Sequence, residues 1–259
     1  MIQGMGGFMS VTGEPDDKPG GGPQKIGVAL CDVLTGLFTS TATLAALAHR
    51  ERTGEGQHID MALFDVTVAA MANQATNYLI GGMVPGRMGN AHPNLVPYNV
   101  FATADHHIIV AVGNDEQFAR LAELVGRPEL ARDPRFATNA ARVANRDALL
   151  AILNEVFKTR NRASWLAGLE KIGVPSGPIN DMAQAFAEPQ AKARGLRIEL
   201  PHPLAGMVPL VASPIRLSET PVEYRNAGPL LGEHTDDVLR EVLGFSGAEI
   251  AKLRAAKVV

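Results

Sequence analysis

An aspartate stands at the point where an apolar run turns into a helical pattern. Residues 27–31 are small or apolar, Asp32 follows, and from residue 34 the apolar and small side chains recur at the spacing of one helical face. The pattern predicts a helix over residues 34–50 with Asp32 at or just before its N-terminus, where free N–H groups and the helix dipole favour negative charge. Asp32 is therefore either a helix cap, a common role of Asp at this place, or a carboxylate available for chemistry.

Further side chains offer alternative chemistry. Cys31 is the only cysteine and is a possible nucleophile, although its place at the end of an apolar run favours a small buried side chain. Residues 81–97 are rich in Gly and Pro and form a predicted loop, in which His92 is either near a substrate or structural. Arg142 and Arg146 are four residues apart on a predicted helix, so they either bind a carboxylate or form surface salt bridges.

Composition excludes several classes of partner. The 259 residues carry a net charge of −3 with no block of Lys or Arg, which argues against a nucleic-acid surface. A single cysteine rules out intrachain disulfides, and no histidines share a metal-ligand spacing, so no metal is expected. The most apolar stretch, residues 59–72, is interrupted by Asp60 and Asp65, so no membrane span is expected.

The first 80 residues predict alternating strands and helices. Residues 1–24 are a Gly- and Pro-rich loop or linker that matches no phosphate-binding motif. After the helix at 34–50, residues 57–63 alternate like a strand and residues 64–80 have a helical pattern. This β-α-β-α order is typical of an α/β fold.

The remaining residues predict a smaller α+β region and a C-terminal segment. Residues 98–102 and 107–112 form strands, followed by helices at 116–125, 141–158 and 164–172, with Trp165 in the core. Strands follow at 196–200 and 207–211, and Ser246 with Glu249 makes a capping box at the last of two terminal helices. We therefore expect three regions: 1–80 as the end of a large α/β domain, 81–190 as a small α+β domain, and 191–259 as a return to the large domain.

Motifs from one end of the chain to the other resemble one enzyme family. They are residues 27–36, Thr53-Gly54-Glu55-Gly56-Gln57, Asn139-x-x-Arg142-Val143-x-x-Arg146, Gly173-Val174-Pro175-x-Gly177-Pro178-Ile179-Asn180 and Leu231-Gly232-Glu233-His234-Thr235. Together they resemble the family III CoA-transferases, which include formyl-CoA transferase, carnitine CoA-transferase and α-methylacyl-CoA racemase. Residues 77–81, 94–98 and 113–118 look closest to members that move CoA between dicarboxylic acids, such as succinate–hydroxymethylglutarate CoA-transferase.

The resemblance implies a reaction and residues to perform it. The family's nucleophilic aspartate aligns with Asp32, which would attack an acyl-CoA thioester and then carry CoA as an aspartyl thioester. Gly89, Asn90 and His92 occupy the place of the family's glycine-rich loop, with a role as lid or in substrate binding. Coenzyme A is then a substrate, no cofactor is permanently bound, and the residues that contact CoA are not assigned. The partners implied are an acyl-CoA and a free carboxylic acid.

The resemblance also implies architecture. It predicts an incomplete dinucleotide-fold-like large domain plus a small domain, in an interlocked homodimer in the cytoplasm. The family's N-terminal segment, which supplies most contacts to the CoA nucleotide, is expected to lie outside these residues.

Two other functions remain open at this stage. The first is an α-methylacyl-CoA racemase or another CoA-ester isomerase, in which Asp32 acts as an acid or base with help from Asp115 or Glu116. The second is an inactive fragment or a partner-binding module.

Overall fold

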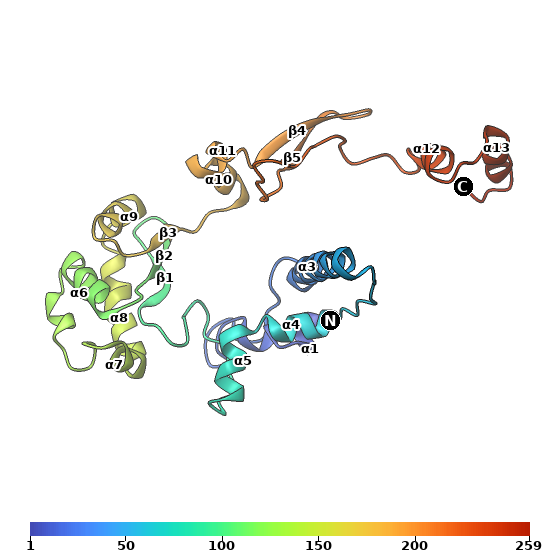
Figure 1. Cartoon of the computed structure of the whole chain (residues 1–259). Coiled ribbons are helices and arrows are strands. Elements are labelled where there is room, and N and C mark those ends of the chain that lie inside the picture. Colours follow the sequence, from blue (N-terminus) through green and yellow to red (C-terminus); the bar gives the residue numbers. More distant parts are fainter. The chain divides into compact units, whose positions relative to one another are not determined.

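The computed structural model describes all residues, Met1–Val259, and they divide into two units, Met1–Ile179 and Asn180–Val259 (Figure 1). Helices occur together with two small antiparallel sheets. The chain thus mixes helices and sheets, as the predicted α/β class requires. The three regions expected from the sequence remain a proposal.

A three-stranded antiparallel sheet lies at the centre of the first unit's core. Its order is β1 (Tyr98–Ala102), β2 (His107–Ala111) and β3 (Ser176–Pro178). Tyr98 pairs with Ala111 and Ile108 pairs with Pro178. The first two strands follow the prediction, whereas β3 was not predicted because Gly and Pro dominate its sequence.

Helices pack against this sheet. They are α6 (Asp115–Leu124), the 3₁₀ turn Pro128–Ala131, α7 (Asn139–Ala144), α8 (Arg146–Phe157) and α9 (Arg162–Lys171). Side chains of Asn114, Thr138 and Asn161 accept N-cap hydrogen bonds at α6, α7 and α9. The single helix predicted over 141–158 is two helices, because Asn145 leaves helical geometry between them.

Aromatic side chains fill the space between these helices and the sheet. Phe157 lies 4.6 Å from Phe101 and 4.9 Å from Trp165, measured between ring centroids. The indole N–H of Trp165 donates to the Phe157 carbonyl at 2.8 Å, so its polar atom is satisfied inside the core. The main hydrophobic core runs from Val96 to Val174, as predicted for Trp165.

About half of the first 95 residues are helical, and few of their side chains are buried. They form α1 (Ile2–Met5), α2 (Phe8–Val11), α3 (Leu30–Thr53), α4 (Leu63–Ala69) and α5 (Ala72–Leu79). Only three hydrophobic side chains in this region are buried, Phe8, Cys31 and Val66.

Three predictions for this region are wrong at the level of elements. The predicted β-α-β-α order takes the apolar run at 27–31 as its first strand and residues 57–63 as its second. Neither forms a strand, because nothing in the chain pairs with them and a strand exists only as part of a ladder. Residues 1–24 carry two short helices rather than a continuous loop. The helix predicted over 64–80 breaks between α4 and α5, where Ala72 has a φ of 47°.

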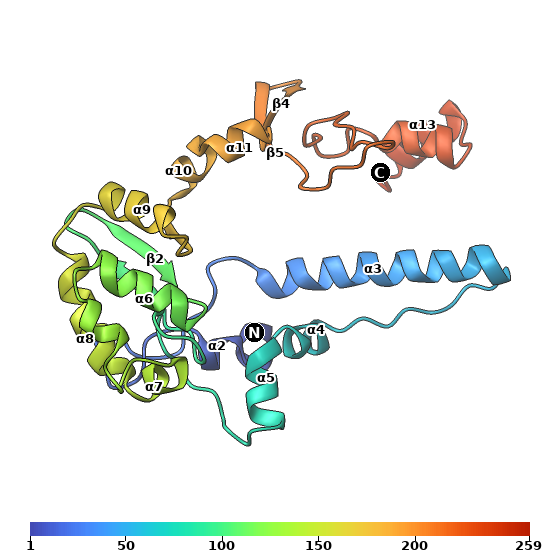
Figure 2. The ribbon, with the colours of Figure 1, turned by 60° about the vertical axis from the view of Figure 1, so that its left-hand side comes forward.

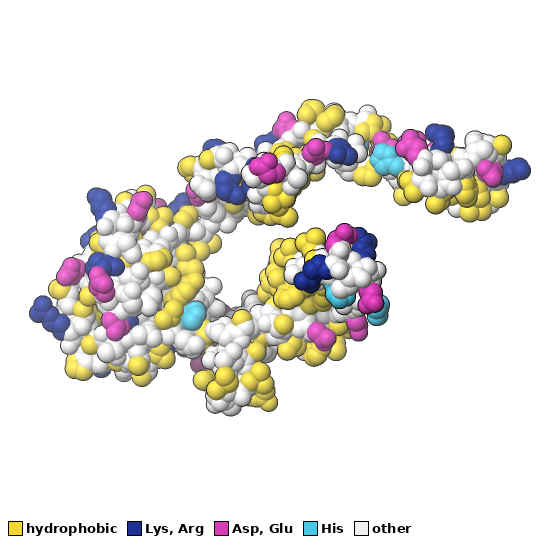
Figure 3. All heavy atoms as spheres, viewed as in Figure 1, with side chains coloured by type: hydrophobic (Ala, Val, Ile, Leu, Met, Phe, Trp, Pro, Cys, Tyr) yellow, Lys and Arg dark blue, Asp and Glu magenta, His cyan; other side chains and the backbone are white.

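Helix α3 is a single helix of 24 residues (Figure 2). Apolar side chains lie on its surface (Figure 3). Hydroxyls of its Ser and Thr residues bond to carbonyls of the same helix, Thr35 to Cys31 at 2.7 Å and Thr41 to Leu37 at 3.0 Å. By length and composition it is the one helix that could cross a membrane, a test that core helices of soluble proteins also pass. The apolar length of α3 was not predicted, because residues 59–72 looked like the most apolar stretch of the sequence.

The second unit contains short elements. They are α10 (Met182–Ala187), α11 (Pro189–Ala193), the hairpin of β4 (Arg197–His202) and β5 (Gly206–Val211), α12 (Thr235–Asp237), the π turn Val238–Val242 and α13 (Gly247–Ala255). The predicted capping box of Ser246 and Glu249 is present at α13. A second capping box, Asp181 with Gln184, begins α10, which was not predicted.

Candidate functional site

Asp32 lies in the first turn of α3 but does not cap it. The N-cap residue is Ala29, so Asp32 is the third residue of the helix. The Asp32 carboxylate is exposed and has neither a hydrogen bond nor a salt bridge within the chain. The ordinary interpretation of Asp32 as a cap is therefore wrong, because the helix begins four residues earlier than predicted. The Asp32 carboxylate thus lies at the positive end of a 24-residue helix with no structural partner, and the helix dipole there favours its negative charge.

Asp32 faces a pocket of about 390 Å³. The pocket is lined by Met1, Ile2, Gln3, Lys25, Gly27, Val28, Ala29, Cys31, Asp32 and Leu63. Cys31 is only 3% exposed, as its apolar neighbours predict. Of the two adjacent candidate nucleophiles, the carboxylate is therefore the accessible one.

The loop that contains Gly89 is tied to residues 13–16. The Gly89 N–H donates to the Gly13 carbonyl at 3.0 Å, and Arg87 donates to the Glu14 carbonyl and pairs with Asp16. Gly89 has a φ of 58°, and a Cβ at this position would lie 2.6 Å from a carboxylate oxygen of Glu14. The positive φ favours glycine at this position, whereas the Glu14 carboxylate is the end of a flexible side chain and can move aside.

His92 is held at the other end of the same loop. Its Nδ1 accepts the Asn94 N–H at 3.1 Å, and its ring stacks on Tyr98 with centroids 5.2 Å apart. Burial, followed by the positive charge of Arg146, lowers the pKa of His92. Since Nδ1 accepts a hydrogen bond, the neutral imidazole carries its proton on Nε2 and can donate from there.

Three side chains of α7 and α8 hold the backbone that follows His92. Asn139 donates to the Asn94 carbonyl at 2.9 Å and accepts the Val96 N–H at 3.2 Å. Arg142 donates to the Val96 carbonyl at 2.6 Å, and Arg146 donates to the Pro93 carbonyl at 2.9 Å. We call these three side chains the loop clamp.

Arg142 and Arg146 do not form the surface salt bridges that were one of their two predicted roles. The Arg142 side chain is fully buried, where it bonds to the Phe136 carbonyl, pairs with Asp115 at 2.8 Å and lies over the Phe118 ring. Arg146 forms no ion pair and belongs to α8 rather than to the helix of Arg142. The hydrogen bonds to Val96 and Pro93 span 46 and 53 residues, so helical spacing alone could not predict them.

The structure does not bring all the predicted site residues into one pocket. Asp32 lines its pocket without Gly89, Asn90 or His92. No group of three or more His, Cys, Asp or Glu side chains is placed to hold a metal ion. Sequence reasoning missed Gln3, which lines the Asp32 pocket, because an isolated Gln in a Gly-rich segment gives no pattern.

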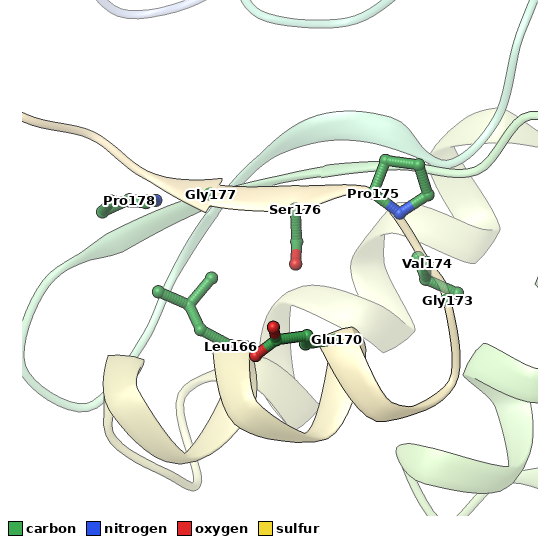
Figure 4. Close-up of a pocket in the computed structure, with 8 residues that line it drawn as sticks. All are labelled: Leu166, Glu170, Gly173, Val174, Pro175, Ser176, Gly177 and Pro178. Atoms are coloured by element: carbon green, nitrogen blue, oxygen red, sulfur yellow. The ribbon is translucent and has the colours of Figure 1, made fainter. Parts of the chain in front are cut away.

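A second pocket, of about 430 Å³, lies along the Gly- and Pro-rich motif at β3 (Figure 4). Leu166 and Glu170 project from α9 toward Ser176 of β3. The motif therefore serves as an edge strand and as the wall of a surface pocket.

Comparison with known proteins identifies the family. The family model described as CoA-transferase family III matches residues 1–235. The chain belongs to CoA-transferase family III. The fold class and the family resemblance predicted from the sequence are thus confirmed.

Two curated relatives are named as CoA-transferases that act on dicarboxylic acids. The chain is 49% identical to the succinate–glutarate CoA-transferase of Agrobacterium fabrum, over 93% of this chain and 60% of the relative. It is 40% identical to the human succinyl-CoA:glutarate CoA-transferase, over 98% of this chain and 57% of the relative. The crystal structure of a CAIB/BAIF family protein from Brucella suis matches with a TM-score of 0.77 and 52% identity, over 93% of this chain and 62% of that one. The chain thus spans about 60% of the length of these family III relatives.

The lowered pKa of His92 predicts a pH dependence of stability. In the unfolded chain His92 takes up a proton near pH 6.5, whereas in the folded chain it does so only at a lower pH. The free energy of unfolding therefore falls as the pH drops below about 6.5. We expect His92→Gln to flatten this part of the profile and to lower stability at pH 8 by about 1 kcal/mol, because the stacking on Tyr98 is lost. Urea unfolding at intervals between about pH 5 and pH 8 measures the free energy of unfolding of both proteins. If this free energy falls equally with pH in both, His92 is not its cause.

Proposed function

We propose that the complete gene product transfers CoA from a dicarboxylic acyl-CoA to a free carboxylic acid, with Asp32 as the nucleophile. The observation that carries the proposal is the unpartnered carboxylate of Asp32 beside a pocket in a family III chain. The dicarboxylate class is supported by the names of the relatives at 49% and 40% identity.

The chemistry follows from the carboxylate. Asp32 attacks the thioester carbonyl, the C–S bond breaks, and a mixed anhydride and free CoA thiolate form. The thiolate then attacks the aspartyl carbonyl of the anhydride, which releases the first acid and leaves CoA on Asp32 as a thioester. The carboxylate of the acceptor acid then attacks the aspartyl thioester, and the two steps run in reverse. They give the new acyl-CoA and free Asp32. Both intermediates are activated acyl groups, so no ATP and no permanently bound cofactor are required.

We also propose that His92 binds the substrate through its Nε2 proton. Its Nδ1 bond and its stacking on Tyr98 fix the ring, and the loop clamp fixes the backbone next to it. A neutral, oriented donor suits a carboxylate or carbonyl oxygen. Gly89 and Asn90 complete the proposed loop over the substrate, and the hydrogen bond of Gly89 to Gly13 limits how far that loop can move.

Mass spectrometry tests the proposed intermediate. When the complete gene product is mixed with succinyl-CoA and digested, the peptide that contains Asp32 is expected to carry CoA or, after hydroxylamine, a hydroxamate. Adduct on Cys31 instead, or no adduct during active turnover, contradicts the mechanism. An isomerase would exchange the α-proton of a branched acyl-CoA in heavy water without forming any adduct.

A homodimer and a cytoplasmic location form part of the same proposal. A free, buried Cys31 suits a reducing compartment. The exposed apolar side chains of α3 support a dimer, because a surface of this kind on a soluble protein marks an interface. They are Val33, Leu37, Phe38, Leu44 and Leu47, between 39% and 66% exposed.

The dimer proposal makes a prediction about α3. Replacing the exposed Leu37 and Leu44 with Asp is expected to convert the complete gene product to a monomer, because two charges would be desolvated in the interface. The mass is measured by light scattering after size-exclusion chromatography. Leu204→Asp, at a leucine of the β4–β5 turn that is even more exposed, is the control. A dimer that persists in the double variant contradicts the role of α3.

A further inference from the structure

The side-chain amide of Gln3 holds the backbone that leads into α3. Its Oε1 accepts the Ile26 N–H at 2.8 Å, and its Nε2 donates to the Ile26 carbonyl at 3.4 Å and to the Val28 carbonyl at 3.1 Å. The amide therefore pairs with both backbone groups of Ile26, as a residue of a neighbouring strand would.

Nothing else in the chain supports this segment by hydrogen bonding. Residues 25–29 belong to no strand, and their other backbone hydrogen bonds run only into the start of α3. The Gln24 N–H bonds to the Thr12 carbonyl at 2.9 Å, which anchors the chain just before the segment. Gln3 thus provides the only hydrogen bonds that reach residues 25–29 from a distant part of the sequence.

This segment determines where the Asp32 carboxylate lies. Only Gly27, Val28 and Ala29 separate the bonded Ile26 from the first residue of α3. Gln3, these three residues and Asp32 line the same pocket. A shift of the segment would therefore move both the wall of the pocket and the helix end that carries Asp32.

We propose that Gln3 is a positioning residue for Asp32, which sets the attack geometry of the carboxylate by fixing Ile26 and Val28. The inference rests on the proposed function of Asp32. Gln3 does not touch the reacting atoms, because both ends of its amide are engaged by the backbone. Its effect should fall on the chemical step, since displacement of a reacting group by about 1 Å can cost about 100-fold in rate.

The test compares Gln3→Met with Gln24→Met in the complete gene product. Met has the length of Gln but no hydrogen bonds, and Gln24 is an exposed residue whose side chain has no hydrogen-bond partner. We expect Gln3→Met to lower kcat between about 10- and 100-fold with little change in KM for succinyl-CoA. Gln3→Glu, which keeps the acceptor for the Ile26 N–H, should recover part of kcat. Gln24→Met should match the unsubstituted protein.

Two readouts separate positioning from a loss of folding. The thermal midpoint of Gln3→Met should equal that of Gln24→Met, while the buried Cys31 thiol should alkylate faster as the first turn of α3 loosens. The proposal is overturned if kcat of Gln3→Met equals the control, if KM alone changes, or if kcat and the thermal midpoint fall together.

Hydrogen exchange of the Ile26 amide tests the role of Gln3 without measuring CoA transfer. Gln3→Met should exchange this amide at least 10-fold faster also in an Asp32→Asn background, because the Oε1 acceptor is lost. If Asp32→Asn remains active, the proposed function fails, and this exchange measurement still decides whether Gln3 fixes the segment. Unchanged exchange overturns the positioning role even when Asp32 is the nucleophile.

Discussion

Asp32→Asn in the complete gene product is expected to lower CoA transfer by about a thousandfold or more while the fold stays intact. The amide cannot form the anhydride, and no other carboxylate lines the pocket. Stability should change by no more than about 0.5 kcal/mol, since the Asp32 side chain has no hydrogen-bond partner and contributes only its interaction with the helix end. Steady-state kinetics and urea unfolding of the same sample measure both effects.

Cys31→Ser is the matched control for this substitution. It changes the neighbouring residue of the same turn but leaves the carboxylate in place, so transfer should continue near the original rate. An Asp32→Asn protein with undiminished activity would contradict the mechanism. A folded but inactive Cys31→Ser would move the chemistry to the thiol.

Arg142→Ala is expected to destabilise the first unit by about 3 kcal/mol or more. The substitution leaves the carbonyls of Val96 and Phe136 without their partner and opens a cavity over the Phe118 ring. Asp115 is half exposed and can return to water, so its loss of a partner contributes little. Urea unfolding followed by the fluorescence of the buried Trp165 measures the loss.

Lys158→Ala provides the contrast. Lys158 pairs with Glu155 at 2.7 Å on the surface of α8, so removal of this pair should cost less than about 0.5 kcal/mol. Equal losses in the two variants would show that Arg142 contributes no more than a surface ion pair.

Local patterns predicted those elements whose partners lie nearby in the sequence. The strands at Tyr98 and His107 form one hairpin, and Ser246 and Glu249 cap their own helix, so short-range spacing was sufficient. The same spacing placed Asp32 at the start of α3, although the helix begins four residues before the predicted one.

Features that depend on distant partners were not predictable in this way. The burial of Arg142 depends on the Val96 carbonyl, and β3 depends on pairing with β2 across more than 60 residues. In residues 57–63 the pattern was misleading. They alternate as a strand would, but no partner strand exists for them to pair with. The role proposed for Gln3 likewise depends on Ile26, 23 residues away.

The hydroxyl groups of α3 influence how the proposed dimer would be held together. Because Thr35, Ser40, Thr41 and Thr43 all bond to carbonyls of their own helix, a covering surface needs to supply no hydrogen bonds to them. Association through this face then depends on shape and on the release of water rather than on charge. Such an assembly loosens on cooling and responds weakly to ionic strength, unlike one held by ion pairs.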